Sequence, residues 1–262
     1  MARPKRPLQR LPVYIGTSGW MYAHWKESFY EGAPQKNWLR IASQKFTGLE
    51  VNATFYHLLN RSTFERWYSE TPSDFRFAVK GNRWVTHRRR LMEVEDAILR
   101  ERERADGLKE KLAVVLWQMP RGLKKDLPRL REFLSLLAEH WGYVRHAVEF
   151  RHKSWFDEET AEVLAQYRTA NVLSDAKDWP LWDVITTDVA YVRLHGHERT
   201  YFSAYSSQDL QIWARRVKRW LSENRSVHVY FDNDAAGYAP LNAMELLEKV
   251  RRSLPKNKIR KK

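Results

Sequence analysis

The segment HAVEFRHKSW (146–155) begins with apolar residues and ends in a cluster of charged ones. A strand buried on both faces should be apolar along its whole length. The same change from apolar to charged or polar residues ends six other short β-rich segments, GLEVNATFY (48–56), FRFAVKGN (75–82), LAVVLWQMP (112–120), NVLSDA (171–176), AYVRLHG (190–196) and SVHVYFDND (226–234). Because ligands bind at the carboxyl ends of parallel strands, these polar ends predict one common site.

Strand and helix signals alternate along nearly the whole chain. The predicted strands are 13–18, 48–55, 75–81, 111–118, 146–151, 171–175, 190–195 and 226–233. The predicted helical segments are 37–45, 62–70, 88–111, 127–140, 158–168, 208–223 and 241–253. The connection 176–188 is too short and too interrupted for a full helix. Eight parallel strands favour a single α/β domain with a (β/α)8, TIM-barrel-like fold, and an open doubly wound sheet is the alternative.

Local signals fix some helix ends. Ser62 and Glu65 have the spacing of a capping box, Thr71 with Pro72 ends the same helix, and Asp157 can cap the helix that follows it. In the charged segment, an apolar line predicts the face that packs on the core, formed by Leu91, Val94, Ile98 and Leu108.

The composition bounds the class of protein. The chain has 262 residues, of which 43% are hydrophobic, enough for one core or for two smaller domains. It has no Cys, which excludes disulfides, thiolate nucleophiles and Cys-ligated metal sites. No apolar run approaches the ~18 residues of a membrane span, and the basic start lacks a signal peptide's apolar stretch. We therefore expect a cytoplasmic protein without a membrane partner.

The net charge of +14 is concentrated at the two ends of the chain. Residues 1–10 carry four basic side chains and residues 255–262 carry five, with no acid in either segment. We therefore expect a barrel domain over residues 11–254 between two basic tails. Such tails can bind the phosphates of a nucleic acid, although they also serve as solubilising ends.

Three pairs of side chains at strand ends are two positions apart and so point the same way. These pairs are Glu149 with Arg151, Arg193 with His195, and Glu50 with Asn52. In a barrel they face the lumen at the upper rim, where other polar groups join them: Lys80, Gln118, Asp175, Asn233 and either Asp232 or Asp234.

Each of these groups has a predicted role. Glu149 is the favoured general acid or base, with Glu50 or Asp175 as its partner and His195 or His87 to carry the proton. An anionic substrate would be bound by Lys80, Arg151 and Arg193. Further contacts to the substrate are predicted from Trp20, Tyr22, Asn52, Tyr56, Gln118, His152, Trp155 and Asn233.

Alternatives remain for several of these residues. The aromatic side chains can pack in the core under long loops instead of contacting a substrate. Arg88 to Arg90 can bind a phosphate or can form the solvated start of a helix. His87, His152 and His195 could hold a divalent metal together with carboxylates, but no metal-ligand spacing such as HExxH is present and no cofactor is identified.

Several motifs together resemble the YecE-like family, known as domain of unknown function 72. They are GTSGWMYAHW (16–25), FTGLEVNATFY (46–56), FRFAVK (75–80) with TH (86–87), LWQMP (116–120), AVEFRHKSW (147–155), YVRLHG (191–196) and YFDNDAAGYAPLNA (230–243). The resemblance spans about residues 13–250. It implies a TIM-barrel-like fold and the same rim residues, but no particular reaction. Trp117 stands where Phe is more usual, and the basic tails are not part of the family pattern.

Three hypotheses follow. The first is an enzyme, a hydrolase, lyase or isomerase, that acts by acid/base chemistry on a phosphorylated, nucleotide-like or other anionic compound. The second is a nucleic-acid-binding protein that uses the basic tails and the rim aromatics without catalysis. The third is a scaffold whose barrel mouth is closed by salt bridges. The oligomeric state and the substrate stay open.

Overall fold

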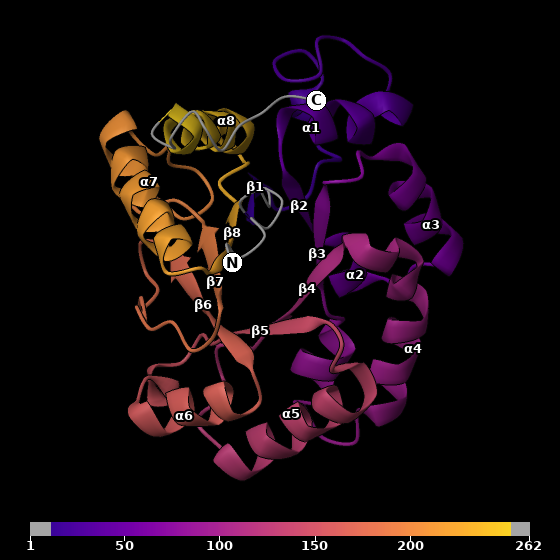
Figure 1. The fold of residues 1–262 in the computed structure, drawn as a ribbon, viewed down its shortest axis with the longest axis vertical. Coiled ribbons are helices and arrows are strands. Elements are labelled where there is room, and N and C mark those ends of the chain that lie inside the picture. Colours follow the sequence, from indigo (N-terminus) through magenta and orange to yellow (C-terminus); the bar gives the residue numbers. More distant parts are fainter. Residues whose placement is uncertain (1–11, 253–262) are drawn as a thin grey trace, which may run out of the picture.

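A computed structural model describes residues 12–252 as eight parallel strands that form a barrel inside a layer of helices (Figure 1). Hydrogen bonds link the strands in the order β1-β8-β7-β6-β5-β4-β3-β2, so neighbours in the sequence are neighbours in the sheet. The strands are β1 Val13–Thr17, β2 Gly48–Val51, β3 Arg76–Lys80, β4 Leu112–Gln118, β5 Arg145–Glu149, β6 Thr169–Asp175, β7 Val189–Leu194 and β8 Ser226–Phe231. The TIM-barrel-like prediction is confirmed, and the open doubly wound sheet is wrong.

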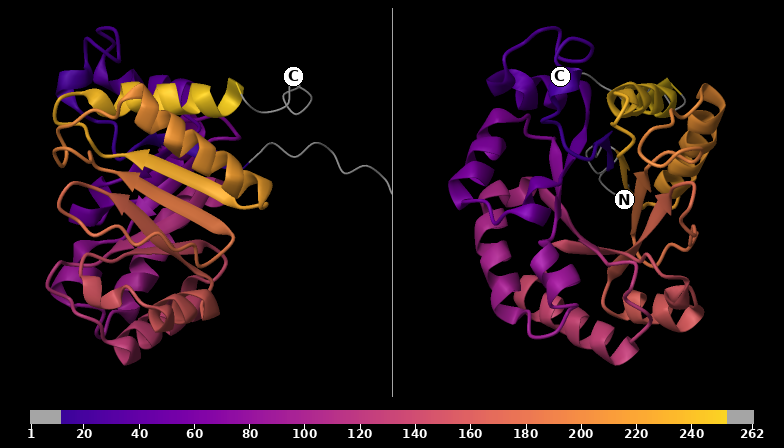
Figure 2. Two further views of the ribbon diagram at one scale, coloured as in Figure 1. Left: turned by 90° about the vertical axis from the view of Figure 1, so that its left-hand side faces the viewer. Right: turned by 180° about the vertical axis from the view of Figure 1, so that it is seen from behind.

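Helices cover the outer face of the strands (Figure 2). The α-helices are α1 Trp38–Lys45, α2 Ala53–Tyr56, α3 Arg61–Glu70, α4 Glu95–Ala105, α5 Leu127–Trp141, α6 Glu158–Gln166, α7 Ser207–Ser222 and α8 Tyr238–Arg252. Short 3-10 helices are η1 Ala23–Trp25, η2 Gln35–Asn37, η4 Asp106–Lys111 and η5 Lys153–Trp155, and η3 Trp84–Arg88 is a π-helix. The connection 176–188 between β6 and β7 has no helix, as predicted. None of the helices in residues 12–252 combines the length and hydropathy that a membrane span requires.

The barrel closes between β1 and β2 through a narrow seam. One parallel bridge joins Ser18 to Glu50, and the amide of Gly19 donates to the carbonyl of Glu50 at 2.8 Å. A Cβ at Gly16 would lie 1.9 Å from the carbonyl oxygen of Gly48, so only glycine lets the two strands approach this closely.

Several predicted ends differ from the structure. The helical segment predicted over 88–111 is an α-helix only over Glu95–Ala105, and two other differences have a clear local cause. Strand β2 ends at Val51 and not at residue 55, because Asn52 turns to helical dihedral angles and Thr54 Oγ1 bonds the carbonyls of Val51 and Lys80 at 3.0 and 2.7 Å. The capping box is wrong, since helix α3 begins one residue earlier and Ser62 lies inside it.

Other predicted ends are confirmed. Thr71 ends α3, and Asp157 caps α6 by accepting from the amide of Thr160 at 2.9 Å.

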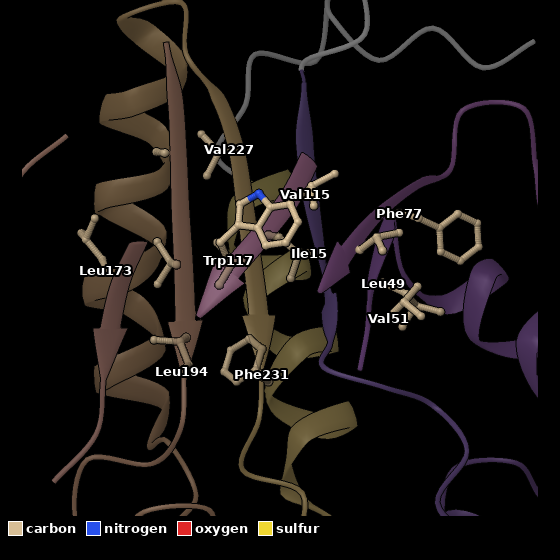
Figure 3. Close-up of a cluster of buried hydrophobic side chains, with 14 of the residues drawn as sticks. Ile15, Leu49, Val51, Phe77, Val115, Trp117, Leu173, Leu194, Val227 and Phe231 are labelled. Carbon is tan, nitrogen blue, oxygen red and sulfur yellow. The ribbon is translucent and has the colours of Figure 1, made fainter. Parts of the chain in front are cut away.

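The apolar core has two layers that alternate along the strands. The outer layer packs between strands and helices and includes Ile15, Leu49, Phe77, Trp117 and Phe231 (Figure 3). The inner layer fills the lumen with Ala78, Val114, Leu116, Ala147, Ala170, Val172, Val189, Tyr191 and Tyr230. The predicted apolar line of Leu91, Val94, Ile98 and Leu108 is buried in the outer layer. Above the inner layer, the lumen-facing positions at the carboxyl ends of the strands are polar.

Candidate functional site

Arg193 stands at the centre of the barrel mouth and is 0% exposed. Its Nε and Nη2 donate to the Glu50 carboxylate at 2.8 to 3.1 Å. Nη1 donates to Glu149 Oε2 at 3.0 Å, and Nη2 also donates to Asp232 Oδ2 at 2.9 Å. One guanidinium therefore binds three carboxylates that come from three different strand ends.

Neutral donors hold the two fully buried carboxylates in place. Glu50 accepts from the hydroxyl of Ser18 and from the Tyr191 hydroxyl at 2.6 Å. Glu149 accepts from the hydroxyl of Ser174 and from Gln118 Nε2 at 3.0 Å. These hydrogen bonds satisfy the carboxylate oxygens of both residues.

Glu149 is ionised at neutral pH. Burial alone would raise its pKa, but the guanidinium groups of Arg151 and Arg193 bring the pKa of this carboxyl well below its ordinary value. Glu149 can therefore accept a proton but does not hold one to donate.

The alternation of side chains along the strands explains how the network forms. All three predicted pairs face the lumen. Arg193 Nη1 lies 3.3 Å from His195 Nε2, and Arg151 Nη2 lies 2.9 Å from Glu149 Oε1. Asn52 Nδ2 donates at 2.8 Å to the Ser18 hydroxyl, which in turn donates to Glu50.

His195 lies between two acids. Its Nδ1 is 3.1 Å from Asp232 Oδ2 and its Nε2 is 3.5 Å from Glu149 Oε1. Burial opposes the charge on Asp232, but Arg193 lowers the pKa of this carboxyl below its ordinary value. Asp234 differs, since burial and the charge of Asp232 raise its pKa to about 6. The two acids at the end of β8 thus have separated pKa values, as in many acid/base pairs.

Lys80 and His87 lie at the edge of the network around Phe55. Lys80 Nζ is 4.3 Å from the centre of the Phe55 ring, and the His87 ring meets the same ring edge-on at 5.1 Å. Burial, and then the charge of Arg193, lowers the pKa of Lys80 to about 8. Burial, and then the charge of Lys80, lowers the pKa of His87 to about 4, so this imidazole is neutral at pH 7.

Arg151 has hydrogen-bonding capacity that no described residue uses. Its guanidinium stacks on Trp179, with Cζ 3.4 Å from the ring centre. Although Nη2 is near Glu149, it is poorly aligned for a hydrogen bond, and Nε has no partner within residues 12–252. Two other buried atoms of the mouth also lack a hydrogen bond there, Asn52 Oδ1 and His195 Nδ1.

Two predicted site residues lie outside the network because their strand positions point outward. Asp175 lies close to His197 and Tyr205. Asn233 Nδ2 donates to the carbonyl of Ser203 at 2.9 Å and to Asn242 Oδ1 at 3.0 Å.

His152 is also outside the network. Its Nδ1 accepts from the amide of Ser154 at 3.1 Å, so it caps a short helix.

The predicted aromatic residues separate by burial. Trp20 and Trp155 belong to the outer core, where Trp20 packs edge-on against Trp67 and Trp155 Nε1 donates to a backbone carbonyl at 2.8 Å. Tyr22 is half-buried and donates to the carbonyl of Ser18 at 2.8 Å. Tyr56 is 59% exposed.

Sequence reasoning missed several members of the network. Ser18, Ser174 and Tyr191 are neutral, so no charge marked them. Residues two positions apart on a strand face the same side. This rule places Ser174, and not Asp175, on the lumen face with Val172, and it places Tyr191 on the same face as Arg193. Asp232, left open against Asp234, is the one that binds Arg193.

No three His, Asp or Glu side chains group as metal ligands in the part of the chain that the structure describes. Arg193 occupies the space between the carboxylates. The basic segments 1–10 and 255–262 lie outside the described residues, so nucleic-acid binding through them stays a prediction.

A groove of about 470 Å³ lies beside the mouth, over the connection after β3. It is lined by Leu58, Asn82, Trp84, Arg89, Glu93, Asp96, Ala97, Arg100 and Glu101. This connection is irregular, with a π-helix followed by left-handed φ angles at Arg90, Leu91 and Glu93. Such backbone is costly and is common near functional sites.

Comparison with known proteins places the chain in a family. The model of the family described as "Protein of unknown function DUF72" matches residues 14–261. The chain belongs to the DUF72 family. It is 26% identical to the UPF0759 protein YunF of Bacillus subtilis, over 90% of this chain and 94% of YunF. It is 22% identical to the UPF0759 protein YecE of Escherichia coli, over 93% of this chain and 94% of YecE.

Two solved structures of the DUF72 family have the same fold. A protein of Thermotoga maritima superposes with a TM-score of 0.80 at 30% identity, over 91% of this chain and 99% of that one. A protein of Enterococcus faecalis superposes with a TM-score of 0.79 at 16% identity, over 93% of this chain and 97% of that one. The family description names no reaction, so the function must be argued from the site.

Proposed function

We propose that the barrel mouth is the active site of an enzyme that binds an anionic small molecule and transfers protons within it. The unsatisfied guanidinium of Arg151 carries the proposal. A buried polar atom without a hydrogen bond costs about 1–3 kcal/mol, more if charged, so native proteins seldom keep one without a reason. An anionic ligand would supply the missing acceptors.

The competing hypothesis, a mouth closed by salt bridges, accounts for Arg193 and for the ion pair of Arg151 with Glu149, but it leaves Arg151 Nε without an acceptor within residues 12–252. Arg193 donates hydrogen bonds to Glu50, Glu149, Asp232 and Ser18. It therefore positions the acids. Arg151 keeps free donors, and its planar group suits the bidentate binding of a phosphate or a carboxylate.

The titratable groups of the mouth, Glu149 beside Arg151 and the acids after β8, can move protons. Glu149 and Asp232 are held ionised, whereas Asp234, with a pKa of about 6, changes its protonation state close to neutral pH. An ionised carboxylate that can accept a proton and an acid that titrates near pH 6 are components of acid/base catalysis. Hydrolase, lyase and isomerase reactions all use this pair.

The test measures anion binding by calorimetry, with inorganic phosphate, sulfate and small carboxylates as probes. Arg151→Met should weaken binding about tenfold or more, because a charged hydrogen bond contributes about 1.5–3 kcal/mol. The matched control is Arg121→Met, which removes an exposed guanidinium 5.6 Å from the centre of the same Trp179 ring. It should bind like the wild type.

The enzymatic step is tested separately with a panel of phosphoesters and sugar phosphates. Glu149→Gln should reduce turnover of any compound that the wild type converts. The proposal fails if the wild type binds none of the anions, or if Arg151→Met binds them as the wild type does.

A further inference from the structure

We propose that Lys80 forms an imine with a carbonyl group of the substrate. The inference rests on the proposed function and adds the substrate class, an aldehyde or ketone that also carries an anionic group. Lys80 is a nearly buried lysine that forms no direct ion pair with any residue of the part of the chain that the structure describes.

Lys80 is only 7% exposed, yet its Nζ has no hydrogen bond and no ion pair within residues 12–252. Three carboxylates act on it electrostatically, but all three are turned toward Arg193. The side chain is buried, but Nζ itself is not among the fully buried nitrogens, so a molecule in the mouth can reach it.

Lys111 shows how this protein buries a lysine for structural purposes. It is 3% exposed, and its Nζ donates to the carbonyls of Tyr68 and Thr71 at 2.5 and 2.7 Å and to Thr71 Oγ1 at 3.1 Å. Lys80 has no such contacts, so its burial serves a different purpose.

The surroundings of Lys80 favour the neutral amine. Its pKa of about 8 means that roughly a quarter of the molecules carry the free amine at pH 7.5, against about one in a thousand at the ordinary value of 10.5. Burial of the side chain, which is 7% exposed, and a nearby cation, here Arg193, are two ways in which proteins activate a lysine nucleophile. The face of Phe55, whose ring centre is 4.3 Å from Nζ, favours the charged form, and burial and Arg193 outweigh it.

The position of Lys80 fits an anionic carbonyl compound. The charges of both Lys80 and Arg151 act on His87, which places the nucleophile and the proposed anion site on the same part of the rim. A small molecule bound to Arg151 through its anionic end could present a carbonyl carbon to Nζ.

The reaction is a condensation. The amine nitrogen attacks the carbonyl carbon and forms the C–N bond. The carbonyl oxygen then leaves as water and takes the two amine protons with it, so no oxidant or reductant is needed. The imine draws electrons from the neighbouring carbon, whose proton or carbon–carbon bond can then break. This is lyase or isomerase chemistry, two of the three reaction types left open above.

The experiment traps the imine by reduction. The full chain is incubated with glyoxylate or pyruvate and sodium cyanoborohydride, and the modified lysines are located by peptide mass mapping. We expect Lys80 to react about tenfold faster or more than any other lysine at pH 7.5. Its rate should rise with pH to a plateau above a midpoint near 8. Lys80→Arg should abolish this fast adduct, and Lys36→Arg, at an exposed lysine, should keep it.

The wild-type map alone decides the proposal, even if Lys80→Arg does not fold. If Lys80 reacts no faster than Lys36, the imine is excluded. If Lys80 is not trapped while Arg151→Met still loses anion binding, only the imine fails and the proposed function stands. If Lys80 is trapped while no anion binds, the imine stands and the anion site fails.

Discussion

Glu101 on α4 is a buried acid whose protonation should control the stability of the protein. Its side chain is 8% exposed and accepts from the amide of Asn82 at 3.0 and 3.2 Å, and within residues 12–252 no cation pairs with it. Burial raises its pKa from 4.5 to about 8. Glu101→Gln keeps a hydrogen-bond acceptor at the same place but cannot ionise.

The sign of the pH effect follows from proton binding. Between pH 4.5 and 8 the folded state holds the proton of Glu101 while the unfolded state releases it, so the free energy of unfolding falls as the pH rises. Because one pKa unit corresponds to about 1.4 kcal/mol, the loss above pH 8 reaches roughly 5 kcal/mol. The variant avoids this loss. It should exceed the stability of the wild type by less than about 1 kcal/mol at pH 5 and by about 3–5 kcal/mol at pH 9.

The assay is urea unfolding followed by tryptophan fluorescence at pH 5, 7 and 9. Glu103→Gln is the control on the same helix, because Glu103 is exposed, and it should stay within about 0.5 kcal/mol of the wild type at each pH. A difference between Glu101→Gln and the wild type that does not grow with pH would refute the reasoning.

Two further predictions concern the packing of the barrel. A Cβ at Gly81 would lie 2.4 Å from the ring of buried Trp117, so Gly81→Ala should lower the free energy of unfolding by about 1–3 kcal/mol. In the double variant with Trp117→Phe, the smaller side chain leaves room for the new methyl group, so part of the lost free energy of unfolding should return. Urea unfolding measures it. If the effects of the two substitutions simply add, the clash is not the cause. Arg193→Met should cost about 3–5 kcal/mol because it leaves buried carboxylates uncompensated. An unchanged melting temperature would show that the network does not stabilise the mouth.

The strand ends and the lumen-facing pairs could be predicted from the sequence because both follow from a period of two. The alternation of eight strand and helix signals predicted the barrel, the polar strand ends predicted its mouth as the site, and the pairs at Glu149 and Arg193 predicted the centre of that site. Trp20 and Trp155 were harder, since a tryptophan after a strand can equally face a ligand or pack under a loop.

The sequence could not show which arginine is satisfied. In the sequence, Arg151 and Arg193 look alike, because each is an arginine at the end of an apolar strand segment. Their difference depends on which carboxylates reach them across the barrel, and Glu50 lies far from Arg193 along the chain. The sequence also could not show that Lys111 has direct hydrogen-bond partners and Lys80 does not, because these partners come from distant parts of the chain.

The pairing of β1 with β8 ties the start of the barrel to its end. Val13 lies opposite Val227 and Thr17 opposite Phe231, and β1 meets its other neighbour through one bridge. During synthesis on the ribosome, β1 must wait for about 200 further residues before its main partner exists. The barrel can therefore close only as a late event, and until then the edge of β1 that pairs with β8 stays open to unwanted pairing.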